Sequence, residues 1–332
     1  MRRAGRLAAA LLGLAVLAGL SALLGVRTLE HWLDSPGPLA EERLVRIPRG
    51  GLDAIVRTLE EAGAVEPGWA FALAARLLGK DRTLKAGEYR IAARASPRAI
   101  LELLESGRVV LHRITVPEGL TTAEIHELLA ASEVLDGPLP PPGPEGTLLP
   151  ETWLVPRGEP RARLLERMRE AMRTTLAELW ANRAQGLPYT EPAEAVVLAS
   201  LVERETPLKV EQPLVAAVFV NRLKRGMRLQ SDPTVVFALS GGRNRLDRPL
   251  TRKDLEVDHP FNTYRIDGLP PAPIANPGRS ALAAALAPAP VDYLYFVADG
   301  TGGHAFARTL AEHNRNVARW RRIREDAERS PE

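Results

Sequence analysis

The sequence contains no cysteine among its 332 residues. This absence excludes disulfide bonds, a thiolate nucleophile and a sulfur-ligated metal, and it is compatible with either side of a membrane. The motif His-Glu-x-x-His is also absent, and His259, His304 and His313 lack the i, i+4 spacing of paired metal ligands on a helix. The sequence therefore predicts neither a bound metal nor a cofactor.

A strong excess of one charge is missing as well. Lys and Arg total 44 against 41 Asp and Glu, which gives a net charge of +3, and the arginines are spread along the chain. Aromatic residues make up only 5% of the sequence and are not interleaved with the arginines, as they are on many nucleic-acid-binding surfaces. We therefore exclude nucleic acid as a partner. The length exceeds that of one compact core and predicts two or three units.

Charged residues are absent from one long stretch near the N-terminus, residues 7–26. At about 1.5 Å per residue, a helix of this length spans a hydrocarbon core of about 30 Å. Arg2, Arg3 and Arg6 precede it, so the positive-inside rule places residues 1–6 in the cytoplasm. We expect a single-pass inner (plasma) membrane protein whose remaining chain lies in the periplasm or otherwise outside the cytoplasm. A cleaved signal peptide is the alternative, but the run is long for one and no small-x-small cleavage site follows it.

Short strands and amphipathic helices alternate after this segment and predict a small α+β region. Its last strand, residues 109–116, is followed by a Pro-Glu-Gly turn and by Thr121 and Glu124, which form a capping box at the start of a helix. The strand, turn and capped helix resemble half of a LysM module, a family that binds the amino sugars of peptidoglycan or chitin. An ordinary βα unit that supports the rest of the protein is the alternative.

The most informative polar residue is Glu203, which lies near the end of the apolar stretch 192–206. Pro192 suits the first turn of a helix, and Pro207 disfavours its continuation. At helical spacing Glu203 shares a face with small and apolar side chains, which predicts a partly desolvated carboxyl group with a raised pKa. Such a group is suited to general acid catalysis near neutral pH. A solvated glutamate in the last turn of a helix is the alternative.

Polar loops at residues 229–234, 262–264 and 268–278 follow this helix, and a strand at 293–298 leads into a glycine-rich turn. Fixed hydroxyl and amide groups beside an aromatic ring are suited to the many hydroxyls of a sugar. The candidate substrate-binding residues are Gln230, Ser231, Asp232, Thr234, Asn262, Tyr264, Asn276 and His304. Each loop taken alone also fits an ordinary turn. A phosphate loop is disfavoured because no Lys-Ser/Thr pair follows the glycines.

Together with Asn314, these segments resemble those of the endolytic murein transglycosylases of the MltG type, the YceG-like family. The resemblance extends from about Val45 to Trp320. It implies a single-pass inner-membrane enzyme with a LysM-like subdomain that cuts nascent peptidoglycan glycan strands, with Glu203 as its catalytic residue. It also suggests penicillin-binding peptidoglycan synthases as partners. The chain departs from the family at Leu149 and Trp153, where an aromatic residue and a tyrosine are usual.

The expected fold class is α+β, with an N-terminal transmembrane helix, a small α+β LysM-like unit and a mainly helical α+β catalytic domain. Five prolines between residues 138 and 144 mark an extended connector. The predicted parts are a cytoplasmic N-terminus (1–6), a transmembrane helix (7–26), a linker (27–43), an α+β region with the LysM-like unit (44–135), a proline-rich connector (136–144), a catalytic domain (145–325) and a tail (326–332).

A single carboxyl group is sufficient for the implied reaction. If the C6 hydroxyl of N-acetylmuramic acid attacks its own C1, the substrate supplies the nucleophile, and Glu203 acts first as acid and then as base. The glycosidic bond to N-acetylglucosamine breaks, a 1,6-anhydromuramyl end forms and strand elongation ends. One alternative is a hydrolytic muramidase with Asp232 or Glu205 as second carboxylate. Another is a non-catalytic, membrane-tethered peptidoglycan-binding scaffold.

Overall fold

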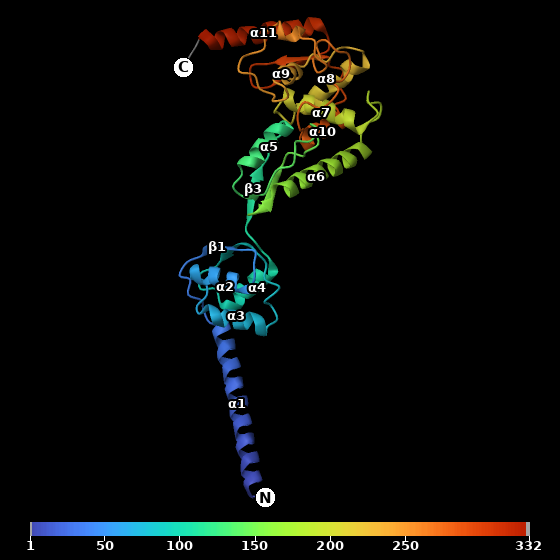
Figure 1. Ribbon diagram of the computed structural model, residues 1–332. Helices are drawn as coiled ribbons and strands as arrows, with labels where there is room; N and C mark the ends of the chain where they lie inside the picture. Colours follow the sequence, from blue (N-terminus) through green and yellow to red (C-terminus); the bar gives the residue numbers. More distant parts are fainter. Residues whose placement is uncertain (1, 330–332) are drawn as a thin grey trace. The chain divides into compact units, whose positions relative to one another are not determined.

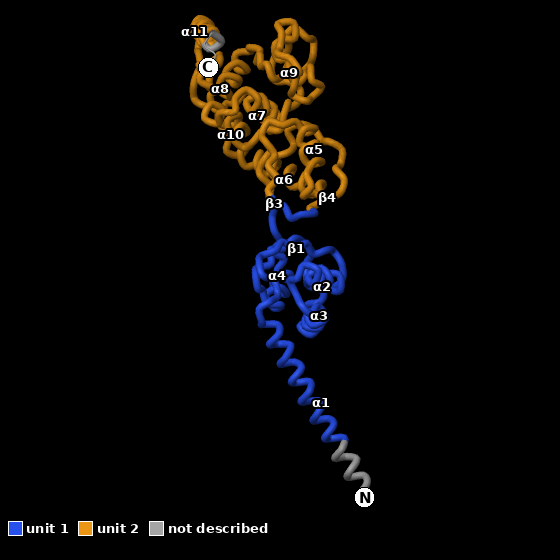
Figure 2. The backbone as a smooth tube through the Cα atoms, turned by 90° about the vertical axis from the view of Figure 1, so that its left-hand side faces the viewer, with its two compact units in different colours: residues 1–112, 155–158 blue, residues 113–154, 159–332 orange. Residues whose placement is uncertain are grey.

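The structure is a computed structural model that describes residues 2–329, and its chain forms two compact units (Figure 2). Unit 1 comprises residues 1–112 and 155–158, and unit 2 comprises residues 113–154 and 159–332. The chain passes between them within strands β3 (Leu111–Thr115) and β5 (Thr152–Pro156), which pair with each other. This division lies earlier than the proline connector of the predicted domains. The reason is that residues 113–154 bond within unit 2, as when the Thr122 N–H donates to the carboxylate of Glu145.

Unit 1 begins with helix α1 (Arg2–Asp34), of which Leu11–Asp34 is long and apolar enough to cross a membrane. It is the one such helix in the described part of the chain. The helix continues past Val26 into the segment expected to be a linker. Tertiary packing explains the extension, because Leu33 in its last turn is only 3% exposed and belongs to the core of unit 1.

The remainder of unit 1 surrounds an antiparallel pair of strands, β1 and β2, with Arg43 opposite Ile91. Alternate residues of the strands are buried against the apolar faces of the helices. The first turn of α4 is capped by the hydroxyl of Ser96, which accepts the Ala99 N–H at 3.2 Å, and Gly107 ends the helix in the left-handed conformation. The elements are β1 (Arg43–Ile47), α2 (Leu52–Glu61), α3 (Gly68–Leu77), β2 (Gly87–Ile91) and α4 (Pro97–Ser106).

Unit 2 is mainly helical and is built around α7, whose residues from Ala195 to Val202 are all buried (Figure 1). Helices α6, α8 and α10 pack on it, and their side chains form one continuous core with it. The elements are α5 (Thr122–Ala131), β4 (Leu135–Asp136), β6 (Glu159–Pro160), α6 (Arg161–Ala181), α7 (Pro192–Glu205), α8 (Gln212–Lys224), α9 (Asp232–Leu239), the 3-10 turn η1 (Asp254–Glu256), α10 (Arg279–Leu286), β7 (Tyr295–Ala298), β8 (His304–Ala307) and α11 (Leu310–Arg329).

The predicted mixture of helices and strands is confirmed, and every sheet in residues 2–329 has two strands. β4 pairs with β6 in parallel, whereas β7 and β8 form an antiparallel hairpin. The capping box of Thr121 and Glu124 is present at the start of α5. The strand before it, β3, pairs with β5, so whether this segment is LysM-like stays a prediction.

Four elements differ from the sequence expectation. Strands β5 and β6 precede α6, where the chain was expected to lead directly into the helix. Helix α9 begins at Asp232, inside the predicted polar loop 229–234, because Ser231 takes the cap position and Pro233 fits the first turn. Helix α10 follows Gly278, and its alanine-rich sequence showed no amphipathic period because it is buried on several sides.

Candidate active site

Glu203 lies in the last turn of α7, directly after the fully buried part of that helix. The helix ends at Glu205 because Thr206, which precedes Pro207, has an extended backbone. The side chain of Glu203 is half-buried. The last turn of α7 therefore places one carboxyl group at the edge of the core of unit 2.

Two groups fix the carboxylate of Glu203. The Gly278 N–H donates to its Oε2 at 2.9 Å, and Nε2 of Gln212 lies 3.5 Å from its Oε1. Gln212 is completely buried at the start of α8, and its own Oε1 has no hydrogen-bond partner among the described residues. The Glu203 carboxyl group is thus held from two sides, one of them a completely buried amide.

The loop that supplies the Gly278 N–H is anchored by Ser200 and Asn276. Ser200, one turn before Glu203, accepts the Ile274 N–H at 3.0 Å. The Asn276 side chain is completely buried, accepts the Leu148 N–H at 2.9 Å and donates to the carbonyl of Leu120 at 3.2 Å. Rigid anchoring of this kind preorganises the donor that contacts the carboxylate.

The backbone of Asn276 also fixes the Pro-Glu-Gly turn that carries Glu118. Its carbonyl accepts the Gly119 N–H at 3.0 Å, and its N–H donates to Leu120 at 2.9 Å. The Glu118 carboxyl group lies against Gly278, where a Cβ atom would come within 2.1 Å of its Oε1. A side chain at this position would displace the Glu118 carboxyl group from its place against the loop. Lys209 pairs with Glu118 at 3.0 Å.

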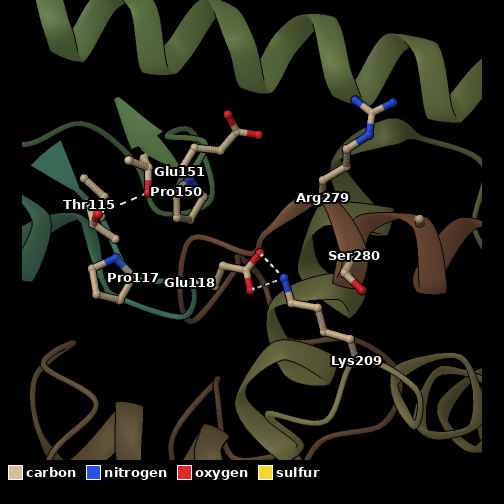
Figure 3. Close-up of a pocket in the computed structure, with 11 residues that line it drawn as sticks. Thr115, Pro117, Glu118, Pro150, Glu151, Lys209, Arg279 and Ser280 are labelled. Atoms are coloured by element: carbon tan, nitrogen blue, oxygen red, sulfur yellow. Dashed lines mark hydrogen bonds and ion pairs between the residues drawn. The ribbon is translucent and has the colours of Figure 1, made fainter. Parts of the chain in front are cut away.

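A cavity of 670 Å³ opens beside this ion pair (Figure 3). In Figure 3, Glu118 and Lys209 point toward one another, with Thr115 and Glu151 on one side and Arg279 on the other. The volume is in the range of pockets that hold a small organic ligand. The cavity is lined by Thr115, Val116, Pro117, Glu118, Pro150, Glu151, Thr152, Lys209, Arg279, Ser280 and Ala283.

The surroundings raise the pKa of Glu203 above its ordinary value. Burial is the largest cause, and the negative charge of Glu118 adds to it. The Gly278 N–H bond and the cations Lys209 and Arg204 act in the opposite direction. Because burial prevails, Glu203 keeps its proton to higher pH than a solvated glutamate, as a general acid requires.

Glu205, two residues further on, lies in a different environment. Burial raises its pKa to about 7, opposed chiefly by a hydrogen bond of 2.5 Å from the hydroxyl of Ser231. The charge of Asp232 raises the Glu205 pKa further, and the hydroxyl of Tyr264 donates to Asp232 at 2.5 Å. The two carboxyl groups at the end of α7 therefore face separate sets of partners.

The candidate residues between positions 230 and 264 bond within the protein, and the hydroxyl of Ser231 connects them to Glu205. The Ser231 N–H donates to the hydroxyl of Thr263 at 2.9 Å, and the Thr234 and Thr263 hydroxyls are 2.9 Å apart. Asn262 donates to the carbonyl of Val257 at 2.8 Å. Ser231, Thr234 and Asn262 are buried, whereas Gln230 and Asp232 are exposed and Tyr264 is half-buried. The buried members hold the loops together.

His304 lies on β8 and is connected to the Glu203 site through α8. Its Nδ1 is 2.7 Å from Oε2 of Glu211, and its N–H donates to the same carboxylate at 2.9 Å. Glu211 directly precedes Gln212, so this pair fixes the start of the helix that touches Glu203. No group of three His, Cys, Asp or Glu side chains suited to a metal occurs in residues 2–329.

Of the predicted site residues, Asn276 lies in the loop whose Gly278 N–H contacts Glu203. His304 bonds to Glu211 at the start of α8, the helix that carries Gln212. Sequence reasoning did not single out Glu118, Lys209 or Gln212. A basic and an amide residue soon after the Pro207 helix stop were visible signals for the last two. Glu118 gave none beyond its place in a tight turn, because its approach to Glu203 depends on tertiary structure.

Comparison with known proteins adds independent information. The family model described as the YceG-like family matches residues 45–319. An endolytic murein transglycosylase of Bacillus subtilis is 38% identical over 172 residues, which cover 52% of this chain and 46% of that protein. An endolytic murein transglycosylase of Streptococcus pneumoniae is 31% identical over 321 residues, covering 82% of this chain and 57% of that protein. The chain thus spans about half the length of these curated relatives.

A solved structure is also similar. It is that of a yceG-like protein from Listeria monocytogenes, with 29% sequence identity and a TM-score of 0.49. The match covers 83% of this chain and 99% of the Listeria chain.

Proposed function

The chain belongs to the YceG-like family, and from that premise we propose that it is an endolytic peptidoglycan lytic transglycosylase. Its substrate is a nascent glycan strand, cut within the strand at the β-1,4 bond between N-acetylmuramic acid and N-acetylglucosamine. The relatives named endolytic murein transglycosylase support this assignment. The observation that carries it is Glu203, a half-buried carboxyl group with a raised pKa, held by the Gly278 N–H, which lies against Glu118 on the wall of the cavity.

Glu203 performs both proton transfers. It first donates its proton to the glycosidic oxygen, so that the bond from C1 of N-acetylmuramic acid to that oxygen breaks and the leaving sugar departs as an alcohol. The C6 hydroxyl of the same muramic acid then forms a bond to C1, and its proton passes to Glu203. The carboxyl group is restored, no water is consumed, and a 1,6-anhydromuramyl end remains.

The Gly278 N–H keeps one oxygen of Glu203 in place during both steps. Stabilisation of the carboxylate by this fixed donor matters most after Glu203 has lost its proton, when the negative charge is full. The cavity beside Glu118 provides the space for a sugar residue, with the side chains of Lys209, Arg279 and Ser280 on its wall. Among the predicted groove residues, Gln230, Asp232 and Tyr264 are accessible enough to contact the strand directly.

The other parts of the proposal concern location and partners. Helix α1 anchors the protein as a single pass in the inner membrane, with residues 1–6 in the cytoplasm and the chain that follows the membrane-spanning helix outside it. Support comes from the apolar stretch of α1 and the arginines that precede it. We also propose that the LysM-like part of residues 44–135 binds glycan and that penicillin-binding synthases deliver the substrate. Activity of a C-terminal reporter of the kind that functions only in the cytoplasm would overturn the orientation.

The decisive experiment measures the mass of the products. The full-length protein in detergent is incubated with uncrosslinked glycan strands, and the released muropeptides are analysed by mass spectrometry. We expect anhydromuramyl ends, and no such product from the Glu203→Gln variant. Products heavier by one water would identify a hydrolytic muramidase. Full activity of folded Glu203→Gln protein in cells would favour a non-catalytic scaffold.

A further inference from the structure

Helix α3 of unit 1 is apolar on two opposite faces. One face, with Phe71, Ala74 and Ala75, is buried in the core of unit 1. The other carries Trp69, Leu73 and Leu77, which follow one another at helical spacing and are 70%, 41% and 64% exposed. A helix in contact with water normally has a polar face, and a contiguous exposed apolar stripe marks an interaction surface.

The single charged residue of α3 does not interrupt this stripe. Arg76 pairs with Asp53 of α2 at 3.2 Å and is not part of the groove described next. The stripe of Trp69, Leu73 and Leu77 therefore contains no charged residue, and the exposed Arg76 lies at its edge.

The stripe continues directly into the surface of α1. Helix α3 lies beside α1 where α1 enters unit 1, as both Figure 1 and Figure 2 show. A groove of 720 Å³ separates the two helices. It is lined by Ser21, Ala22, Leu24, Gly25, Val26, Thr28, Leu29, Trp32, Pro67, Trp69, Ala70, Leu73 and Leu77.

The groove straddles the point at which the uncharged run of α1 ends, between Val26 and Arg27. Two tryptophans, Trp32 and Trp69, line its walls, and the indole N–H of Trp32 donates to the carbonyl of Glu66 at 3.2 Å. Tryptophan is enriched at the boundary between hydrocarbon and water, where its ring is in lipid and its N–H is hydrogen-bonded. Both residues thus lie at the depth expected of an interfacial belt.

We propose that α3 is a membrane-interface helix, which lies in the surface of the bilayer that α1 crosses, with Trp69, Leu73 and Leu77 in contact with lipid acyl chains. Lipid is the occupant of the groove because the apolar surface of α3 is continuous with that of α1, which is exposed along its membrane-spanning length. The proposal rests on α1 spanning the membrane. Its consequence is that unit 1 is held at the bilayer surface by two helices.

The absence of native cysteine allows a direct test with single spin labels. Full-length Leu73→Cys and Leu77→Cys proteins are labelled and reconstituted in lipid nanodiscs, and the collision rates with oxygen and with a water-soluble nickel chelate are measured. Leu44→Cys is the matched control, because Leu44 is also an exposed leucine of unit 1, 52% exposed, and belongs to β1, a strand that Figures 1 and 2 show on the side of the unit away from the membrane-spanning part of α1. Leu17→Cys in α1 reports the anchor itself.

We expect the ratio of oxygen to nickel collisions at positions 73 and 77 to be several-fold higher than at 44 and to approach that at 17. Equal ratios at 73, 77 and 44 would overturn the proposal. Spin–spin broadening of the labels at positions 73 or 77 would show a second copy of the chain in the groove. Low access of both reagents to these labels would show that protein covers them. Either result also contradicts lipid contact. A water-accessible label at 17 would instead remove the membrane anchor.

Discussion

The two sides of the end of α7 differ in how completely their polar groups are satisfied. Around Glu205, the hydroxyls and amides of Ser231, Thr234 and Asn262 bond to one another and to backbone, and all three are buried. Around Glu203, the amide oxygen of Gln212 has no partner in the described part of the chain, and Glu118 and Lys209 line an open cavity. One side is a closed network and the other is open to a ligand.

This difference separates two uses of polar residues. A buried group whose hydrogen bonds are all made within the protein stabilises a loop, and its removal leaves its partners unsatisfied at a cost of about 1–3 kcal/mol each. A polar group on the wall of a cavity, such as Glu118 or Lys209, adds less to stability but is accessible to a substrate. We therefore expect substitutions of buried groups that are fully bonded within the protein, such as Asn276, to change stability, and substitution of Glu203 to change activity.

The largest expected effect is that of Glu203→Gln. The amide retains the size of the side chain and still accepts the Gly278 N–H, but it has no proton for the leaving sugar. General acid catalysis contributes about 10² to 10⁴ in rate, and because one group serves as acid and base we expect a loss of kcat at or beyond the upper value. The measurement is release of anhydromuramyl product.

Stability serves as the control for this variant. A half-buried carboxyl group is costly to desolvate, so the Tm of Glu203→Gln should equal that of wild type or slightly exceed it. A rate near that of wild type would remove Glu203 from the mechanism. A large fall in Tm would contradict the open-side interpretation of its surroundings.

The second effect is a loss of stability in Asn276→Ala. Removal of this buried amide leaves the Leu148 N–H without its acceptor and the Leu120 carbonyl without a side-chain donor. We expect the free energy of unfolding to fall by roughly 2–4 kcal/mol in a urea titration. Asn182→Ala is the control, because Asn182 is exposed at the end of α6 and makes one bond, to Glu178. Similar losses in both variants would contradict the role of the Asn276 amide in anchoring its loop.

The sequence predicts the local part of this arrangement well. The boundaries of α7 follow from Pro192 and Pro207, and the capping boxes before α5 and α11 appear as expected. These signals act through the backbone of neighbouring residues, so they can be read without tertiary information. The raised pKa of Glu203 was also expected, since its neighbours along the helix are apolar.

The partners of Glu203 could not be predicted in the same way. Glu118 reaches the site only because Asn276, far along the chain, bonds to Gly119 and Leu120. A sequence also does not reveal whether a polar side chain is already satisfied. Asn276 and Asn262 were both expected to bind sugar because amides suit that role, and the structure has their amides bonded within the protein.

The third effect concerns Glu205→Gln and its pH dependence. Folding raises the pKa of Glu205 from its ordinary value of 4.5 to about 7, because burial disfavours the ionised carboxylate. The contribution of Glu205 to the free energy of unfolding is therefore most favourable below pH 4.5, where the group is protonated in both states, and it is lost as the pH rises through about 7. Gln cannot ionise. Each pKa unit corresponds to about 1.4 kcal/mol, and this value is discounted because Glu205 is not fully enclosed. At pH 8 we therefore expect the free energy of unfolding of the variant to exceed that of wild type by on the order of 1–2 kcal/mol.

Thermal unfolding of Glu205→Gln and wild type between pH 4 and pH 8 measures this difference. The variant should show a flatter curve over that range and retain most of the transglycosylase activity. A loss of activity as large as that of Glu203→Gln would instead make Glu205 a second catalytic carboxylate, as in a hydrolytic muramidase.

The smallest effect is a shift in the pH profile caused by the pair beside Glu203. Glu118→Gln removes a negative charge that raises the Glu203 pKa, so the alkaline limb of kcat/KM should move to lower pH. Lys209→Met removes a positive charge that lowers this pKa and leaves Glu118 unpaired, so the limb should move to higher pH. Because Lys209 is largely exposed, we expect each shift to stay below about one unit and to shrink as salt is added.

Both residues line the cavity, so either change also alters the rate at its plateau, and the position of the limb is therefore the informative quantity. Opposite shifts from two isosteric changes are not produced by damage to folding, whereas shifts in the same direction, or none, would mean that Glu118 and Lys209 do not set the proton affinity of Glu203.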